Sequence, residues 1–272
     1  MRDGERHAAL EHIADEVRVC TRCRLHQQRS NSVPGEGNPD TEVVFVGEGP
    51  GYNEDREGRP FVGRAGGLLV KLLASVGWQR EDVFITNVVK CRPPENRDPE
   101  ADEIAACAPF LRRQMEVLDP ALVVTLGRFS MATFMPGARI SQAHGTMHPV
   151  DPATGAADAL VFAMYHPAAA LRATDIEQAS FRDMAGVPAA LVAGRDRRRR
   201  HAGGHGSTDS TKATVVVAPA VVSPPAIVAA PAVVPAPAAD PPPRAVPAAD
   251  APPDVIPPAS LPTDPADQLT LF

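Results

Sequence analysis

The stretch EVVFVGEGPG, residues 42–51, decides the fold class of this chain. Its first half is an apolar run without polar alternation, which is typical of a strand buried on both faces of a parallel sheet. The glycines that follow permit a tight turn and a close approach of backbone N–H groups to a ligand. The turn has neither the G-x-G-x-x-G pattern nor a following Gly-Lys-Ser/Thr, so it does not indicate a dinucleotide site or a P-loop.

Similar apolar runs recur along the chain, and helical patterns separate them. Strands are expected at Glu42–Val46, Val83–Val89, Ala121–Leu126 and Ala159–Met164. Helices are expected at Glu5–Val19, Ala65–Ser75, Pro99–Leu118, Arg128–Phe134 and Asp175–Ala193. This alternation predicts an α/β fold, a three-layer α/β/α sandwich with a central, mostly parallel four-stranded sheet.

Composition separates the C-terminal part from the rest. The chain has 272 residues and 30 prolines, of which 16 lie after residue 200, and Phe272 is the one Phe, Tyr or Trp beyond Gly194. Such a segment buries too little side-chain area to offset the entropy of ordering its backbone. We therefore expect one folded domain at residues 1–195, a disordered linker, first basic and then Pro/Ala-rich, at 196–266, and a separate peptide at 267–272.

The charge of the expected domain is nearly balanced. Of the formal net charge of −6, residues 1–200 contribute −2, from 25 basic and 27 acidic residues. Binding to nucleic acid would therefore need local basic patches. The cluster at 195–200, RDRRRR, is either such a phosphate-binding patch or a solvated start of the linker, and the sequence leaves both open.

Targeting signals are not evident in the sequence. No apolar stretch approaches the ~20 residues that span a bilayer, and the first residues, MRDGE, do not start a secretory signal. A cytoplasmic monomer without a membrane partner is expected.

Four cysteines lie in the expected domain: Cys20 and Cys23 as C-x2-C, then Cys91 and Cys107. In a cytosolic chain such a set indicates a metal centre more than disulfides, and zinc and iron–sulfur are the choices. The two single cysteines, one after a strand and one inside a helix, favour a [4Fe-4S] cluster over a zinc ribbon. The alternative is that Cys107 is a small buried residue and that the C-x2-C pair alone has a chemical role.

Polar side chains lie at the carboxyl ends of three predicted strands, where ligands of parallel sheets bind. They are Glu48, Asn87 and His166. An Asn amide offers a donor and an acceptor to a pyrimidine edge, and a His can donate to an oxygen that gains charge. Phe61 could stack on a ring. Each residue alone could be a satisfied structural group, but together they predict a binding site.

These residues fall in motifs that resemble the family 4 uracil-DNA glycosylases, the iron–sulfur branch of the uracil-DNA glycosylase superfamily. The resemblance covers approximately Val19 to Arg172. It rests on the C-x2-C pair, GEGPGYNEDREGRPFVG at 47–63, TNVVKCRPPENRDP at 86–99, Cys107, and YHPAAALR at 165–172. Several independent motifs in the correct order make it specific.

The resemblance implies a repair enzyme of the nucleoid that flips deoxyuridine from DNA and releases uracil. Four residues would contact the base: Phe61 by stacking, Asn87 at the N3/O4 edge, the Gly49 backbone from the first turn, and His166 at O2, where the leaving uracil carries charge. The four cysteines named above would ligate a structural [4Fe-4S] cluster.

The carboxylates of the first turn are the candidates for orienting water or supporting the sugar cation. Classical uracil-DNA glycosylases carry an Asp where this chain has Gly49, so Glu48 is the first candidate, with Glu54 and Asp55 behind it. Glu54 could instead exclude thymine. Leu171 matches the residue that wedges into the duplex after flipping. The basic His-containing insertion of a related branch that captures DNA covalently does not follow Pro94, which favours turnover.

The C-terminal residues QLTLF resemble the short peptide by which bacterial repair proteins dock on the sliding clamp. In that interpretation Gln268 makes a polar contact and three apolar side chains, Leu269, Leu271 and Phe272, fill a hydrophobic cleft. The alternative is an apolar chain end without a partner.

Three functions are therefore compared. The first is a monofunctional uracil-DNA glycosylase that starts base-excision repair. The second is a non-catalytic iron–sulfur module that binds DNA at modified bases, and the third is a zinc-bearing nucleotide hydrolase.

Overall fold

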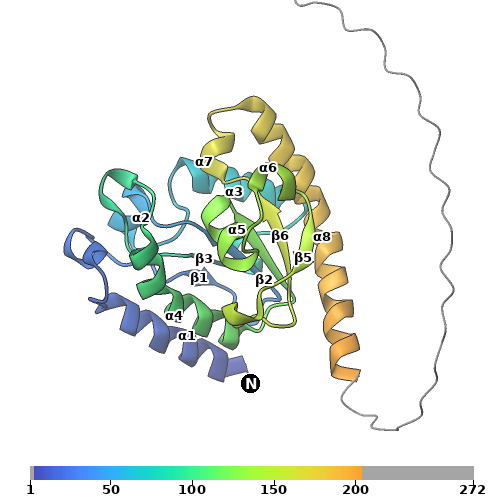
Figure 1. Cartoon of the computed structure of the whole chain (residues 1–272), viewed down its shortest axis with the longest axis horizontal. Coiled ribbons are helices and arrows are strands. Elements are labelled where there is room, and N and C mark those ends of the chain that lie inside the picture. The colour runs from blue at the N-terminus through green and yellow to red at the C-terminus, as the bar shows by residue number, and fades with distance from the viewer. Residues whose placement is uncertain (1–2, 204–272) are drawn as a thin grey trace, which may run out of the picture. The chain divides into compact units, whose positions relative to one another are not determined.

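A six-stranded sheet forms the centre of the computed structural model, which describes residues 3–203 (Figure 1). The strand order is β1-β3-β2-β4-β6-β5. Four central strands run parallel: β2 (Val43–Gly47), β3 (Phe84–Asn87), β4 (Leu122–Leu126) and β6 (Leu160–Met164). The predicted α/β fold and its parallel sheet are confirmed.

Two short edge strands extend the predicted sheet. They are β1 (Glu36–Gly37) and β5 (Met147–Pro149), and each pairs antiparallel with its neighbour. Both are exposed or half-buried and too short to carry an apolar pattern, so no sequence pattern predicts them. The expected linker beyond residue 203 and the C-terminal QLTLF peptide lie outside the described residues.

The two faces of the sheet are covered by different helices, because successive strand residues point to opposite faces. Val44 and Val46 pack with α1 (Asp3–Arg18), α4 (Ala101–Leu118) and α5 (Arg128–Phe134). Val43 and Phe45 pack with α3 (Arg64–Ser75) and α8 (Thr174–Gly203). Figure 1 shows α1 and α4 side by side on one face and α8 along the other.

Short helical segments connect these layers. They are α2 (Tyr52–Glu57), α6 (Ile140–Ala143), α7 (Pro167–Ala170) and the 3-10 turns Arg24–Gln27, Arg80–Asp82, Pro94–Asn96 and Pro152–Thr154. Among residues 3–203, no helix is both long and apolar enough to cross a membrane.

Helix α8 continues ten residues beyond its expected end at Ala193. Gly194 does not stop it, because this glycine is buried where α8 meets β4: a Cβ there would lie 2.3 Å from the Ala121 carbonyl oxygen. The basic cluster therefore begins inside a helix. Residues 196–203, expected in the linker, are helical.

Acidic residues before the central strands pair with this basic cluster. Arg195 pairs with Glu42 and Arg198 with Asp119, which precede β2 and β4. The cluster thus anchors α8 to the amino ends of the parallel strands, the opposite end from Gly47 and Asn87. These ion pairs engage two of the five arginines of the cluster.

Candidate active site and metal centre

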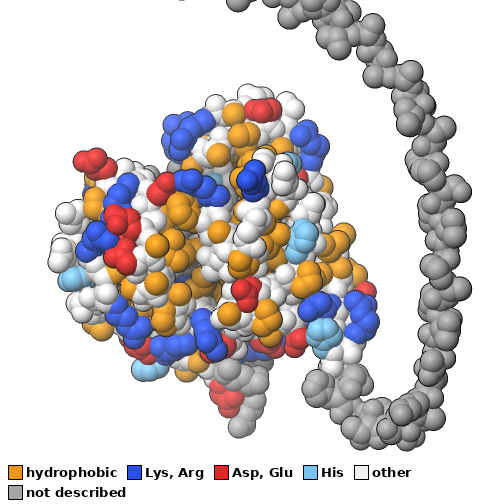
Figure 2. Space-filling view, viewed as in Figure 1, with side chains coloured by type: hydrophobic (Ala, Val, Ile, Leu, Met, Phe, Trp, Pro, Cys, Tyr) orange, Lys and Arg blue, Asp and Glu red, His pale blue; other side chains and the backbone are white. Residues whose placement is uncertain are grey.

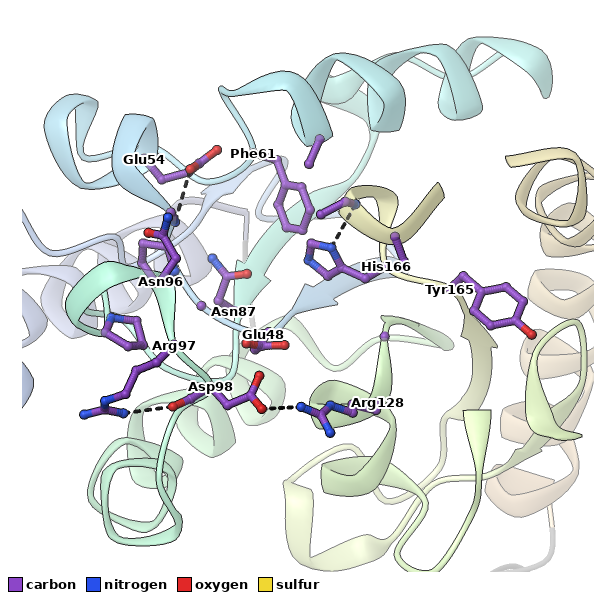
Figure 3. A pocket seen from close by; sticks show the side chains of 18 of the residues that line it. Glu48, Glu54, Phe61, Asn87, Asn96, Arg97, Asp98, Arg128, Tyr165 and His166 are labelled. Atoms are coloured by element: carbon purple, nitrogen blue, oxygen red, sulfur yellow. Dashed lines mark hydrogen bonds and ion pairs between the residues drawn. The ribbon is translucent and has the colours of Figure 1, made fainter. Parts of the chain in front are cut away.

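A cavity of about 540 Å³ opens at the carboxyl ends of the central strands (Figure 3). Its volume is typical of a small-molecule site. The six residues that the sequence predicts for substrate contact or catalysis all line it: Glu48, Gly49, Glu54, Phe61, Asn87 and His166. The fold therefore brings together side chains that are up to 118 positions apart in the sequence.

Asn87 lies at the base of the cavity. The parallel register of β2 and β3 pairs it with Gly47, and its side chain is 1% exposed. Its Oδ1 is buried and has no hydrogen-bond partner among the described residues. An unpaired buried acceptor costs about 1–3 kcal/mol, so a ligand donor is the natural partner for this oxygen.

Close packing around Gly47 fixes the positions of the Asn87 side-chain amide and the Phe61 ring. A Cβ at residue 47 would lie 2.4 Å from Asn87 Oδ1 and 2.6 Å from Phe61 Cζ. Only a residue without a side chain lets these two groups approach the strand end together.

The rings of Phe61 and His166 stack against each other in the cavity wall, with centroids 5.7 Å apart (Figure 3). His166 precedes α7, and its Nδ1 accepts the Ala168 backbone N–H at 3.1 Å. The one proton of the neutral ring is therefore on Nε2, available as a donor. Burial lowers the pKa of His166 to about 4. Glu54 acts to raise this pKa and Arg172 acts to lower it, both less strongly than burial, so the ring is neutral at physiological pH.

Glu48 lies at the edge of the cavity, directly after β2. Burial raises the pKa of its carboxyl, Asp98 raises it further, and Arg128 acts in the opposite direction. Asp98 and Arg128 form an ion pair beside it (Figure 3). A carboxylate with a raised pKa is suited to accept a proton.

The other two predicted carboxylates bind backbone. The oxygens of Glu54 accept the N–H groups of Gly51 at 3.1 Å, Val62 at 3.0 Å and Gly63 at 2.9 Å. Asp55 accepts the Ser30 N–H and does not line the cavity. Glu54 therefore ties the Gly-rich turn to the segment that follows Phe61, and Asp55 ties the turn to the loop after Cys23.

One buried cation beneath the site was not identified from the sequence. Lys90 Nζ donates to the hydroxyl of Thr86 at 2.6 Å, to the carbonyl of Asn87 at 2.8 Å and to Oε1 of Gln114 at 2.7 Å. Burial lowers the pKa of Lys90 to about 8. This ammonium fixes the end of β3 against α4. A lysine in an apolar run was the one sequence signal for it.

The four cysteines are unpaired and gather beside one core. Cys20 and Cys23 follow α1, Cys91 follows β3, and Cys107 lies in α4, and all four pack with the same apolar cluster. Burial raises the pKa of Cys107 to about 11, so a metal centre is the partner that would hold its thiolate.

Nearby N–H groups donate to the sulfurs of these cysteines. Within residues 3–203, no three His, Cys, Asp or Glu side chains are arranged to hold a single metal ion. Three sulfurs accept N–H groups: Cys91 from Arg29 Nη1 at 3.0 Å, Cys107 from the Lys90 backbone at 3.3 Å and Cys20 from the Arg22 backbone at 3.5 Å. Hydrogen bonds to sulfur are typical of iron–sulfur sites.

Comparison with known proteins identifies the family. The profile described as the uracil DNA glycosylase superfamily matches residues 34–185. A type-4 uracil-DNA glycosylase of Saccharolobus solfataricus is 49% identical over 188 residues, which are 67% of this chain and 86% of the relative. A type-4 enzyme of Thermotoga maritima is 48% identical, over 61% of this chain and 85% of the relative. The chain belongs to the type-4 uracil-DNA glycosylases.

The type-5 branch is more distant from this type-4 uracil-DNA glycosylase. A type-5 enzyme of Pyrobaculum aerophilum is 33% identical over 153 residues, which are 50% of this chain and 65% of the relative. The family predicted from the sequence motifs is thus confirmed.

A methyl group at residue 47 tests the geometry of the site. Gly47→Ala should lower uracil excision at least about tenfold, because its Cβ displaces Asn87 and Phe61 from their common position. Gly67→Ala is the matched control: this exposed glycine in α3 has open space around its Cβ, and the change should leave excision intact. Equal single-turnover rates for both variants would contradict the assigned geometry.

Proposed function

We propose that this protein hydrolyses the N-glycosidic bond of deoxyuridine in DNA and so starts base-excision repair. The observation that carries the proposal is the unpaired Oδ1 of Asn87 in a cavity walled by Phe61 and His166. Asn87 is buried, out of reach of a base that stays in the stack, so the nucleotide must be flipped into the cavity.

Recognition uses both atoms of the Asn87 amide. Oδ1 accepts N3–H of uracil and the amide nitrogen donates to O4, while the Phe61 ring stacks on the base. Cytosine presents an acceptor at N3 and a donor at N4, so the same amide orientation repels it. Specificity against cytosine therefore comes from one fixed side chain.

Cleavage places negative charge on the leaving base. The C1′–N1 bond breaks with its electron pair going to uracil, and the sugar becomes oxocarbenium-like. His166 donates its Nε2 proton as a hydrogen bond to O2, where this charge gathers, and such a donor is worth about 3 kcal/mol. Glu48 orients a water molecule toward C1′ and accepts its proton as the C1′–O bond forms.

The surface around the cavity supports local contacts to DNA. Arg97, Arg128 and Arg172 line its rim. Basic and acidic side chains alternate in small groups on the face shown in Figure 2, in keeping with the near-neutral charge. Leu171, exposed at the end of α7 and next to Arg172, is the proposed wedge into the duplex.

The four cysteines are proposed to hold a [4Fe-4S] cluster. When bound, it supplies iron–thiolate bonds that join the end of α1, the end of β3 and α4. Arg24 already tethers the C-x2-C loop to α4 through Glu100 and Asp102. The cysteines therefore have a structural role here and take no part in excision.

Variants at the cavity test the catalytic proposal. Asn87→Ala and His166→Ala should each lower single-turnover excision about 10²-fold or more and change DNA affinity much less, because both contacts strengthen in the transition state. The product of wild type should be free uracil with an uncut strand. Unchanged excision in both variants, or DNA binding without base release by wild type, would favour a non-catalytic module.

The pH dependence of excision identifies the carboxylate. Because the pKa of Glu48 is raised and the carboxylate form is the active one, the rate should rise with pH through that pKa. His166, with a pKa of about 4, adds no inflection near neutrality. In Glu48→Gln the acid limb should vanish and the plateau fall about tenfold or more. An acid limb with the same midpoint in this variant would assign the titration to another group.

Metal analysis tests the cluster. Cys91→Ala should lose the visible iron–sulfur absorption and unfold at a lower temperature, whereas Arg29→Met, which removes one hydrogen bond to the Cys91 sulfur, should retain iron and sulfide. Purified wild type with one zinc and no iron would overturn the assignment and favour a zinc protein.

The C-terminal QLTLF peptide is proposed to dock on the bacterial sliding clamp. The proposal rests on sequence alone. Leu271→Ala with Phe272→Ala should abolish clamp association and leave excision on a short oligonucleotide unchanged, because every proposed catalytic residue lies before residue 200. Equal clamp affinity for this variant and wild type would refute the docking role.

A further inference from the structure

The ring that covers the cavity depends on an uncommon backbone conformation. Phe61 has a φ of 52°, in the left-handed region that residues other than glycine seldom adopt. A bulky residue stays there only when its surroundings hold it. Contacts on both sides of Phe61 therefore hold its backbone with the ring over the site.

The backbone N–H groups of the two residues after Phe61 already have a hydrogen-bond partner. Glu54 accepts those of Val62 and Gly63, as described above. The carbonyl groups of Pro60 and Phe61 need a separate partner, because a carboxylate has no proton to offer them.

Arg80 supplies that partner from the 3-10 turn before β3. Its Nη1 donates to the Phe61 carbonyl at 3.0 Å and its Nη2 donates to the Pro60 carbonyl. Two consecutive carbonyls thus bind one planar guanidinium, whose rigid fork restricts both peptide planes. The Arg80 side chain is only 15% exposed.

Glu36 fixes Arg80 in turn. Oε1 of Glu36 accepts Nε of Arg80 at 3.0 Å and Nη2 at 2.9 Å. Glu36 itself lies in β1 and is paired with Ile85 of β3, two positions before Asn87. The same strand therefore carries the base-reading amide and, through β1, the support of the stacking ring.

Arg59 contacts Glu36 from the solvent-exposed side of this carboxylate. Its guanidinium binds both oxygens of Glu36, at 2.8 and 2.9 Å, and its side chain is 57% exposed. Burial acts to raise the pKa of Glu36, but the hydrogen bonds from Arg59 and Arg80 lower it, so the carboxylate is charged near neutral pH. No hydrogen bond from Arg59 to the Pro60 or Phe61 carbonyl is present in the described structure.

We infer that Arg80, fixed by Glu36, is a positioning residue for excision that holds Phe61 in its left-handed conformation over the flipped base. This inference rests on the proposed function, since it gives Phe61 its task. Arg80 does not line the cavity and touches neither base nor sugar. Its whole effect on the rate is therefore exerted through Phe61.

A double-mutant cycle tests this dependence. Arg80→Met should lower single-turnover excision at least about tenfold when Phe61 is present, and less than about twofold in the Phe61→Ala background, because the ring that Arg80 positions is then absent. Arg80→Lys keeps the charge but loses the planar fork that holds both carbonyls and Glu36 in fixed positions, so it should not restore the rate. If Arg80→Met folds poorly, Glu36→Gln takes its place in the double-mutant cycle with Phe61→Ala.

Arg59→Met is the matched control. It removes an arginine from the same carboxylate but leaves both carbonyl contacts, so excision should fall less than about threefold. Melting temperature and iron content report the fold of every variant. Equal losses from Arg80→Met in both backgrounds, or an equal loss from Arg59→Met, would overturn the inference. Absence of excision by wild type would instead reject the proposed function, so the two failures are distinguishable.

Discussion

The parallel pairing of β2 with β3 is the constraint on which the rest of the site depends. Its register places Gly47 beside Asn87, and the ladder continues beyond the strands as Val88 and Val89 donate to the carbonyls of Gly47 and Glu48. The chain after Asn87 then reaches Lys90 and Cys91 within four residues. One strand end therefore carries the amide proposed to read the base, its buried support and a proposed cluster ligand.

The site keeps groups in states that cost stability. Asn87 has a buried acceptor without a protein donor, His166 is held neutral by burial, and Phe61 has a left-handed backbone. Each is the state that the proposed binding and cleavage of a flipped uracil would use, and several surrounding contacts hold the group in it. The α4 helix and the cysteine core hold one side of this arrangement, and the β1 edge holds the other.

Much of this could be predicted from the sequence, because buried strands and their polar ends are local patterns. The four parallel strands, the cavity residues and the cysteine set followed from apolar runs, strand ends and motif order. Contacts between distant residues could not be predicted. Arg80 and Glu36 are 44 positions apart, and nothing in either neighbourhood indicates their pairing. The helix expected to end at Ala193 continues through Gly194, because this glycine allows close packing against Ala121 inside α8.

The central claim is that the unpaired Oδ1 of Asn87 exists to accept N3–H of uracil. Competition of excision by free uracil and by 3-methyluracil tests it directly, because the methyl group removes this donor and leaves the O4 and O2 edges in place. The account predicts that 3-methyluracil inhibits at least about tenfold more weakly, since it leaves the buried oxygen unpaired. Equal inhibition by the two bases would contradict the account.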